Sequence, residues 1–239
     1  MPKSNQNAAH YFIETHLEAG RGEAIAFIEA ASGKRISYST LSANSSKVAG
    51  ALTRAGIKRE ERAAILMLDS IDYVEVFWGC LKAGVIAVPI NTLLAGAVYD
   101  TILSDSRASC LFVSAALLQA VAPVLAKNDH IRKVIVVGDH PLEDGFESYQ
   151  TFTKGAPEQA AVAVSPDETA FWLYSSGSTG QPKGVRHVHS SLKATSDTYG
   201  AKILGLVQND IVFSAAKLFF AYGLGNALTF PMSVGATSI

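Results

Sequence analysis

Residues 174–184 carry the run Tyr174-Ser175-Ser176-Gly177-Ser178-Thr179-Gly180-Gln181-Pro182-Lys183-Gly184. The run follows the apolar segment Ala170–Tyr174, and this order predicts a strand that ends in a loop. Such a loop offers many backbone N–H groups, several hydroxyls and one lysine ammonium. These donors are suited to holding a polyphosphate. The sequence therefore points to chemistry on ATP.

Two simpler interpretations of the run are a flexible linker and a Walker A loop. Gly and Ser are typical of linkers, but a linker rarely carries Pro-Lys-Gly between two apolar segments. The Walker pattern G-x-x-x-x-G-K-[ST] is not met, because Lys183 lies three residues after Gly180. Pro182 also disfavours the immediate helix start that a Walker loop needs. The order of the residues in this run is thus a far more specific sign of a phosphate-binding loop than their composition.

The composition is that of a chain with a sizeable core. It has 239 residues, a formal net charge of -1, 49% hydrophobic residues and 17% charged residues, which allows one large or two small domains. The near-neutral charge, with no block of Lys and Arg, argues against a nucleic-acid partner. Met1–Ala9 lacks the apolar region of a signal peptide. Cys80 and Cys110 lie in apolar surroundings, which favours buried thiols in a cytoplasmic protein.

The last segment, Leu218–Ile239, contains no charged residue and is long enough to span a bilayer. Glycines, Thr229 and Pro231 interrupt it, so we expect a buried helix followed by a buried strand, and no membrane association. The His, Cys, Asp and Glu residues show no metal-ligand spacing, so we expect no metal held by protein ligands.

Apolar runs alternate with helix-length segments along most of the chain. We expect strands at Ala24–Ile28, Lys34–Tyr38, Arg62–Leu68, Val85–Pro89, Ala108–Val113, Lys133–Val137, Thr169–Tyr174, Gly184–His187 and Asp210–Phe213. We expect helices from Ser39 or Thr40 as N-cap to Ala55, and at Asp72–Ala83, Ala95–Leu103, Ala115–Ala126, Ser190–Tyr199 and Leu224–Phe230, with a short helix around Phe146–Phe152. Gly56 and Gly84 are the expected stops of the first two helices.

This alternation implies βαβ units, and so an α/β fold with mostly parallel sheets flanked by helices. Periodicity alone does not decide the strand order. Residues 139–167 are rich in acids, Pro and Gly, and we expect them to form a surface excursion between lobes at about 1–138 and 168–239.

A second run, at residues 217–226, reads Lys-Leu-Phe-Phe-Ala-Tyr-Gly-Leu-Gly-Asn and is expected at a strand-to-helix turn. Composition alone favours core packing for it. Lys217 is expected to be a solvated or helix-flanking lysine, His187 a strand residue without a role, and His189 a residue that caps or packs the following helix.

The loop resembles the phosphate-binding signature of the adenylate-forming superfamily, [ST]-S-G-[ST]-T-G-x-P-K-G, at every position. This superfamily includes acyl-CoA synthetases, luciferases and peptide-synthetase adenylation domains. The resemblance implies that the β- and γ-phosphates of ATP are wrapped by Ser175, Ser176, Gly177, Ser178, Thr179 and Gly180. It also implies that Lys183 is catalytic and neutralises charge as pyrophosphate leaves.

Residues 217–226 resemble benzoate-CoA ligases in particular, as do Asn91–Leu94 and Phe213–Ala216. Many superfamily members carry Pro-Leu-[FY]-His-x-x-Gly here, and Phe220 stands where that His usually lies. The resemblance implies an aryl pocket at Phe220, Ala221, Tyr222 and Gly223, with Phe220 at the carboxylate entrance. Phe219 is expected to face the core.

The resemblance thus implies an aryl-CoA ligase of the benzoate type, represented by the N-terminal portion of its AMP-binding large domain. ATP, a Mg²⁺ carried in with ATP, and coenzyme A are the implied cofactor and co-substrates. Because the family is considerably longer, we expect this chain alone to be inactive and poorly soluble or partner-dependent. It could be a homodimer or need a missing C-terminal half. Two alternatives stay open: a non-catalytic binding module or split-enzyme half, and a ligase for another aryl or cyclic acid.

Overall fold

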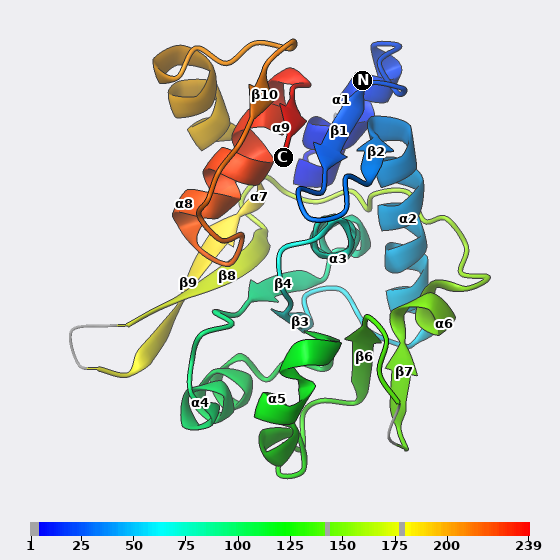
Figure 1. Ribbon diagram of the computed structural model, residues 1–239, viewed down its shortest axis with the longest axis vertical. Coiled ribbons are helices and arrows are strands. Elements are labelled where there is room, and N and C mark those ends of the chain that lie inside the picture. Colours follow the sequence, from blue (N-terminus) through cyan, green and yellow to red (C-terminus); the bar gives the residue numbers. More distant parts are fainter. Residues whose placement is uncertain (1–4, 142–143, 177–179) are drawn as a thin grey trace.

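Two β-sheets organise the chain in the computed structural model, which describes residues 5–141, 144–176 and 180–239 (Figure 1). Within these residues the larger sheet has the strand order β7-β6-β5-β3-β4-β8-β9, and the smaller sheet has the order β10-β11-β1-β2. The larger sheet is built from β3 (Arg62–Leu66), β4 (Ile86–Pro89), β5 (Cys110–Ser114), β6 (Lys133–Val137), β7 (Phe146–Ser148), β8 (Thr169–Ser176) and β9 (Pro182–Val188). The smaller sheet is built from β1 (Ile25–Ile28), β2 (Arg35–Ser37), β10 (Ile211–Val212) and β11 (Thr237–Ser238).

Neighbouring strands are parallel except in the two hairpins β1–β2 and β8–β9. The expected α/β class with mostly parallel sheets is therefore confirmed. The strand β9 is longer than expected, because its pairing with β8 continues from Val188 back to Pro182.

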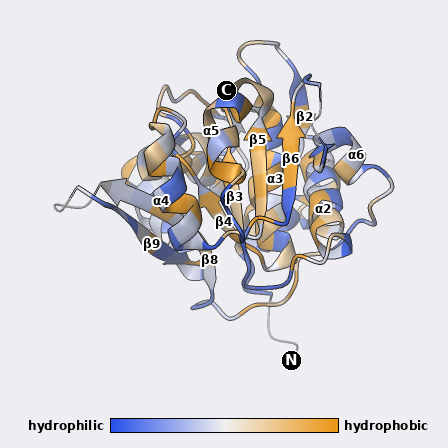
Figure 2. Ribbon diagram, turned by 90° about the horizontal axis from the view of Figure 1, so that it is seen from below, coloured by the Kyte–Doolittle hydropathy of each residue, from blue (hydrophilic) through white to orange (hydrophobic). Residues whose placement is uncertain are grey.

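Helices cover both faces of the larger sheet. The helical segments are η1 (His10–Glu14), α1 (Thr15–Glu18), α2 (Tyr38–Arg54), α3 (Ile71–Ala83), α4 (Gly96–Ser106), η2 (Ala115–Leu117), α5 (Leu118–Leu125), α6 (Tyr149–Thr153), α7 (His189–Thr195), η3 (Ser196–Ile203), α8 (Ala221–Gly223), η4 (Leu224–Thr229) and α9 (Phe230–Val234). In β3, Ala63 and Ile65 face the core under α2 and α3, whereas Ala64 and Leu66 face the core under α4 and α5. This alternation explains why the inner strands β3, β4, β5 and β6 are mostly apolar, as Figure 2 shows for β5 and β6.

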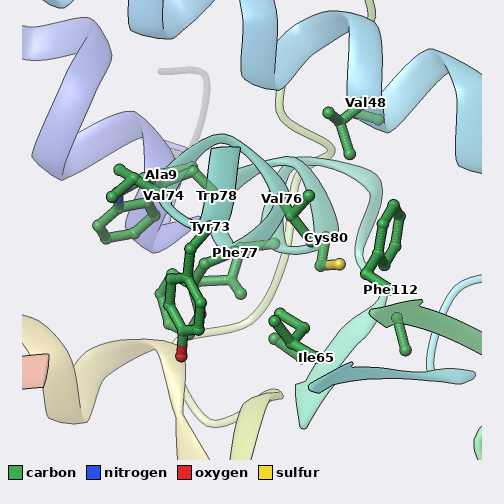
Figure 3. Close-up of a cluster of buried hydrophobic side chains, with 14 of the residues drawn as sticks. Ala9, Val48, Ile65, Tyr73, Val74, Val76, Phe77, Trp78, Cys80 and Phe112 are labelled. Atoms are coloured by element: carbon green, nitrogen blue, oxygen red, sulfur yellow. The ribbon is translucent and has the colours of Figure 1, made fainter. Parts of the chain in front are cut away.

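The helix α3 lies at the centre of the larger core. Its side chains Tyr73, Phe77 and Trp78 are fully buried, and the helix packs between Val48 of α2 and Ile65 of β3 (Figure 3). Ser70 caps its N-terminus by accepting a hydrogen bond from the Tyr73 N–H at 3.2 Å. Gly84 ends it in the left-handed conformation, at φ 71°.

The N-cap of α2 differs from the expectation. Ser37, rather than Ser39 or Thr40, has the extended backbone of an N-cap and accepts a hydrogen bond from the Thr40 N–H at 3.2 Å. Ser37 is also the last residue of β2, so the chain turns from strand to helix without a connecting residue. Gly56, at φ 75°, follows the end of this helix as expected.

A buried ammonium joins three helical segments. The Lys82 side chain of α3 is 0% exposed, and its Nζ lies 2.6 Å from a carboxylate oxygen of Glu14 in η1. The same Nζ donates to the Ser42 carbonyl oxygen at 2.9 Å and to the Ser46 hydroxyl at 3.0 Å, both in α2. Burial lowers the pKa of Lys82, and the nearby Glu14 carboxylate acts in the opposite direction.

The two expected lobes share both sheets. The strands β8 and β9 join the sheet that β3 to β6 begin, and β10 and β11 join β1 and β2. The segment expected as a surface excursion contributes β7 to the edge of the larger sheet, and it contributes the buried side chains of Tyr149 and Phe152 in α6 to the core. A strand occupies residues 146–148, where the sequence suggested the start of a helix.

From Gly223 on, the uncharged last segment forms mostly buried helical segments and then a short strand, as expected, whereas Phe220, Ala221 and Tyr222 before it are exposed. Leu224, Leu228 and Met232 are buried in consecutive helical segments, and Ser238 lies in β11 between β10 and β1. Every helix in the described residues falls short of what a bilayer crossing requires. Cys80 and Cys110 are free and buried, as expected.

Candidate active site

The β8–β9 hairpin presents the Gly/Ser-rich loop at its tip. Ser175 is paired with Lys183, and Ser176 with Pro182, in the antiparallel register. Gly180 has φ 77°, a conformation that favours glycine over residues with a Cβ. Three of the expected phosphate-binding residues lie outside the described residues: Gly177, Ser178 and Thr179. Lys183 is exposed and forms no ion pair within the described chain, so its ammonium is available to a ligand.

The end of the hairpin next to the loop is anchored to α4. The Tyr174 hydroxyl donates a hydrogen bond to Asp105 at 2.5 Å, and the pKa of Tyr174 is raised by burial and by this carboxylate. Gly184 allows the strand to pack closely, because a Cβ there would lie 3.2 Å from Tyr174 and 3.3 Å from Trp172. The Arg62 guanidinium lies 6.0 Å from the centre of the Trp172 ring. These contacts fix the strand that leads into the loop.

A large cavity of about 740 Å³ opens between the hairpin, α4 and the start of α8. Loop residues Ser175 and Gly180 line one part of it, and Phe220 and Ala221 line another. The remaining lining residues are Pro89, Asn91, Leu94, Ala97, Val98, Thr101, Ile102, Leu173, Tyr174, Gln181, Pro182, Val185, His187 and Phe219. The structure therefore brings residues of the two sequence runs to one cavity.

The aromatic run divides between core and surface. Phe219 is buried, as expected, and packs against the Phe220 ring at a centroid distance of 4.5 Å. Phe220 is 47% exposed and lines the large cavity. Ala221 is the first residue of α8 and also lines it. Tyr222 is 71% exposed and lines neither this cavity nor the smaller one next to it.

Gly223 permits a close approach of two backbone segments. A Cβ at this position would lie 2.0 Å from the Lys217 carbonyl oxygen and 2.7 Å from the Ala216 carbonyl oxygen. Its backbone is helical, with φ −68°, which any residue can adopt. Glycine is required here because there is no room for a side chain. Gly223 lines neither cavity of the described site. It holds α8 against the preceding segment and thereby sets the position of Ala221.

A small cavity of about 130 Å³ lies beside the large one. Leu173, His187 and Ala221 line both cavities. The small cavity is otherwise lined by Phe171, Ser191, Leu192, Thr195, Leu224, Gly225, Thr229 and Phe230. Most of these side chains are apolar, and the volume is that of a single ring rather than a long chain.

Phe230 is a wall of the small cavity that sequence reasoning missed. Two glycines make room for it, because a Cβ at Gly225 would lie 2.7 Å from the Phe230 ring and one at Gly200 would lie 3.0 Å from its Cβ. The Tyr199 ring also packs on it, at a centroid distance of 5.6 Å. The glycines are visible in the sequence, but their common neighbour is a tertiary contact.

The two histidines that follow the loop have different surroundings. His189 is buried at the start of α7, where its Nδ1 accepts a hydrogen bond from the Ala8 N–H at 3.1 Å. Burial lowers its pKa to about 4. His189 therefore packs the helix start against the N-terminal segment. His187 faces both cavities, which sequence reasoning did not foresee.

Lys217 forms an ion pair with Asp69, whose carboxylate lies 3.5 Å from its Nζ. The other oxygen of Asp69 accepts from the Leu218 N–H at 3.2 Å. Within the part of the chain that the structure describes, no group of three His, Cys, Asp or Glu side chains could hold a metal ion.

The chain is similar to several known ligases. It is 41% identical to a 4-hydroxybenzoate–CoA/benzoate–CoA ligase of Rhodopseudomonas palustris, over all of this chain and 44% of the relative. It is 42% identical to a benzoate–CoA ligase of Thauera aromatica, over 98% of this chain and 44% of the relative. The chain thus spans less than half the length of these curated relatives.

Solved structures agree with this likeness. The fold matches that of an anthranilate CoA ligase in complex with anthranoyl-AMP, with a TM-score of 0.93 at 32% identity, over 98% of this chain and 45% of that one. It also matches a benzoate CoA ligase from Burkholderia xenovorans LB400, with a TM-score of 0.87 at 39% identity and the same coverage. The family of AMP-binding enzymes matches residues 14–239. The chain therefore belongs to the AMP-binding enzyme family.

Proposed function

We propose that this chain forms the nucleotide-phosphate and aryl-acid part of an aryl-CoA ligase that acts on benzoate or a close relative of it. The observation that carries the proposal is the large cavity, because Ser175 and Gly180 of the loop and Phe220 and Ala221 of the aromatic run line the same space. A carboxylate held beside Ala221 would face a nucleotide held by the loop.

The reaction has two steps. A carboxylate oxygen of the acid attacks the α-phosphate of ATP, and pyrophosphate leaves. The thiol of coenzyme A then attacks the acyl carbon, and AMP leaves. The loop needs no nucleophile of its own in this scheme, because its work is positioning and charge stabilisation. Loop N–H groups, the Ser175 and Ser176 hydroxyls and the Lys183 ammonium stabilise the charge that gathers on the leaving pyrophosphate.

The small cavity is the proposed place of the aromatic ring. Phe230 and Leu224 offer apolar walls, and Ala221 keeps the entrance narrow without filling it. The named activities of the relatives support an aromatic acid, and they include benzoate and 4-hydroxybenzoate. Phe220 lies in the large cavity only, where it borders the path of the carboxylate.

A magnesium ion is proposed to enter with ATP. The described loop residues offer hydroxyl and backbone groups but no carboxylate, and Mg²⁺ commonly keeps several waters while it binds substrate phosphates.

The large cavity exceeds the space that a benzoate and a phosphate tail need, so it also leaves room for the approach of coenzyme A.

Replacing Lys183 with alanine is expected to weaken binding of magnesium pyrophosphate to the 239-residue chain about tenfold, since a hydrogen bond from a charged donor is lost. Titrations followed by ³¹P NMR measure this. Arg186→Ala is the matched control, because it removes one exposed positive charge from the opposite face of β9. Equal losses in the two variants would mean that only net charge matters, and no binding by the unmodified chain would contradict the phosphate site.

The 239-residue chain by itself is expected to make no benzoyl-CoA. It spans 44% of the length of the benzoate ligases it resembles, and Phe220 and Tyr222 of the aromatic run stay exposed in it. Consumption of coenzyme A thiol in the presence of ATP, Mg²⁺ and benzoate measures the reaction, with the Thauera aromatica ligase as positive control. Sustained product formation by the chain alone would show that it carries the whole catalytic apparatus.

A further inference from the structure

His187 stands at the junction of the two cavities. It is one of three residues that line both, and the other two, Leu173 and Ala221, have no polar side-chain atom. The side chains at positions 183, 185 and 187 of β9 share one face of the strand. The loop lysine and this histidine therefore face the same side.

Packing, rather than hydrogen bonding, fixes the imidazole of His187. Its ring is stacked on Phe171 at a centroid distance of 4.5 Å and an interplanar angle of 7°. Phe171 is 2% exposed and is itself held edge-on by Phe77, at 5.8 Å. Neither ring nitrogen of His187 has a hydrogen-bond partner among the described residues. A rigid, half-buried ring with free polar edges is suited to receive a ligand group.

An aryl acid that places its ring in the small cavity and reaches towards the loop must cross the junction. The group at the crossing is then its carboxylate. We propose that His187 donates a hydrogen bond to the carboxylate of the bound aryl acid and orients it as the nucleophile. This inference rests on the proposed function, to which it adds a positioning residue.

A neutral donor suits this role. Burial lowers the pKa of His187, so its imidazole is neutral at physiological pH and donates from one nitrogen only. A neutral hydrogen bond orients an anionic oxygen while withdrawing less of its charge than an ion pair does. The oxygen then forms its bond to the α-phosphorus, the bond to the pyrophosphate oxygen breaks, and the imidazole proton stays on its nitrogen throughout.

Of the charged groups near His187, Lys183 lies on the same face of β9, four residues away. Asp105 of α4 accepts a hydrogen bond from the Tyr174 hydroxyl. Arg186 lies on the opposite face of β9. Lys193 of α7 forms an ion pair with Asp197 of η3. The Nδ1 of His189 is occupied by the Ala8 N–H. Helical segments α8 and η4 carry no charged side chain, and Lys217 pairs with Asp69.

The test is a benzoate titration of the 239-residue chain with ¹³C-labelled histidine, followed by NMR. Benzoate is expected to shift the His187 ring resonance and to raise the pKa of His187, because a carboxylate beside the ring favours the imidazolium. Benzamide, which has the same shape without the charge, is expected to shift the resonance without raising that pKa. His187→Gln assigns the signal.

Affinity gives a second readout. His187→Leu is expected to weaken benzoate binding about tenfold, with less effect on benzamide. His187→Gln, which keeps an N–H donor, should restore part of that loss. His130→Leu, at an exposed loop position, is the matched control and should change nothing. Thermal unfolding of each variant separates lost binding from lost structure.

The outcomes separate the two proposals. If benzoate shifts the Ala221 methyl resonance but leaves the pKa of His187 unchanged, the role of His187 is refuted and the aryl site stands. An equal loss of benzoate and benzamide binding in His187→Leu would likewise reduce His187 to a packing residue. If benzoate, up to its solubility limit, perturbs neither residue, the aryl site itself is refuted, whatever the pyrophosphate titrations give.

Discussion

Replacing Lys82 with alanine is expected to lower the free energy of unfolding by about 3 kcal/mol or more, which is the cost of breaking a buried ion pair. The Lys82 side chain is fully buried, and its ammonium is bound by Glu14, Ser42 and Ser46. Alanine removes the cation and its aliphatic stem together. The Glu14 carboxylate then loses its counter-charge, and a cavity opens between η1, α2 and α3.

Urea unfolding followed by circular dichroism measures this change. Lys82→Met keeps most of the stem and should fall between the alanine variant and the unmodified chain, which separates the packing contribution from the charge. Lys127→Ala removes an exposed lysine and should leave the unfolding midpoint in place. If Lys82→Ala unfolds at the same urea concentration as Lys127→Ala, the buried network contributes nothing to stability.

Replacing Gly223 with alanine is expected to cost about 3 kcal/mol of stability and to abolish the binding of aryl acids. The new methyl would lie 2.0 Å from the Lys217 carbonyl oxygen, and overpacking of this kind commonly costs 1–3 kcal/mol. Because the clash is with backbone rather than with a flexible side chain, α8 must move. Ala221 moves with α8, so the junction of the two cavities changes shape.

Gly96→Ala is the matched control for this variant. Gly96 begins α4, and a Cβ there would meet nothing closer than the Ala120 carbonyl oxygen at 3.7 Å. Alanine in a helix of ordinary conformation should be neutral or mildly stabilising. Thermal unfolding and benzoate titration of both variants make the comparison. A Gly223→Ala chain as stable as Gly96→Ala would contradict the close approach of the two backbone segments.

The sequence predicted the elements well where signals are local. The helix at residues 71–83 has its stop at Gly84, a residue suited to the left-handed turn found there. The N-cap of α2, expected at Ser39 or Thr40, was missed by two or three residues, because the pairing of β2 with β1 extends to Ser37 and the helix starts at once. Strand order was not predicted, since β4 lies beside β8 through contacts between distant segments.

The sequence predicted the two segments of the candidate site but not how they come together in space. The loop and the aromatic run are contiguous in sequence, so their residues could be named. Phe230 and His187 enter the site only because α9 and β9 come to lie on either side of one small cavity. No spacing in the sequence encodes that meeting. The need for glycine at position 223 was equally unpredictable from the sequence. The atom that excludes a side chain there is a backbone carbonyl oxygen, which every residue type has.

The pairing of β11 with β1 has a consequence for how the protein is made. The Thr237 hydroxyl donates to the Ile25 carbonyl oxygen across 212 residues of chain, and β11 separates β10 from β1. During synthesis the β1–β2 hairpin leaves the ribosome early and finds no partner on its inner edge until residue 238 emerges. Contacts of such long sequence separation form slowly. Translation speed and chaperones that shield strand edges should therefore affect the correct formation of the smaller sheet more strongly than that of the β8–β9 hairpin.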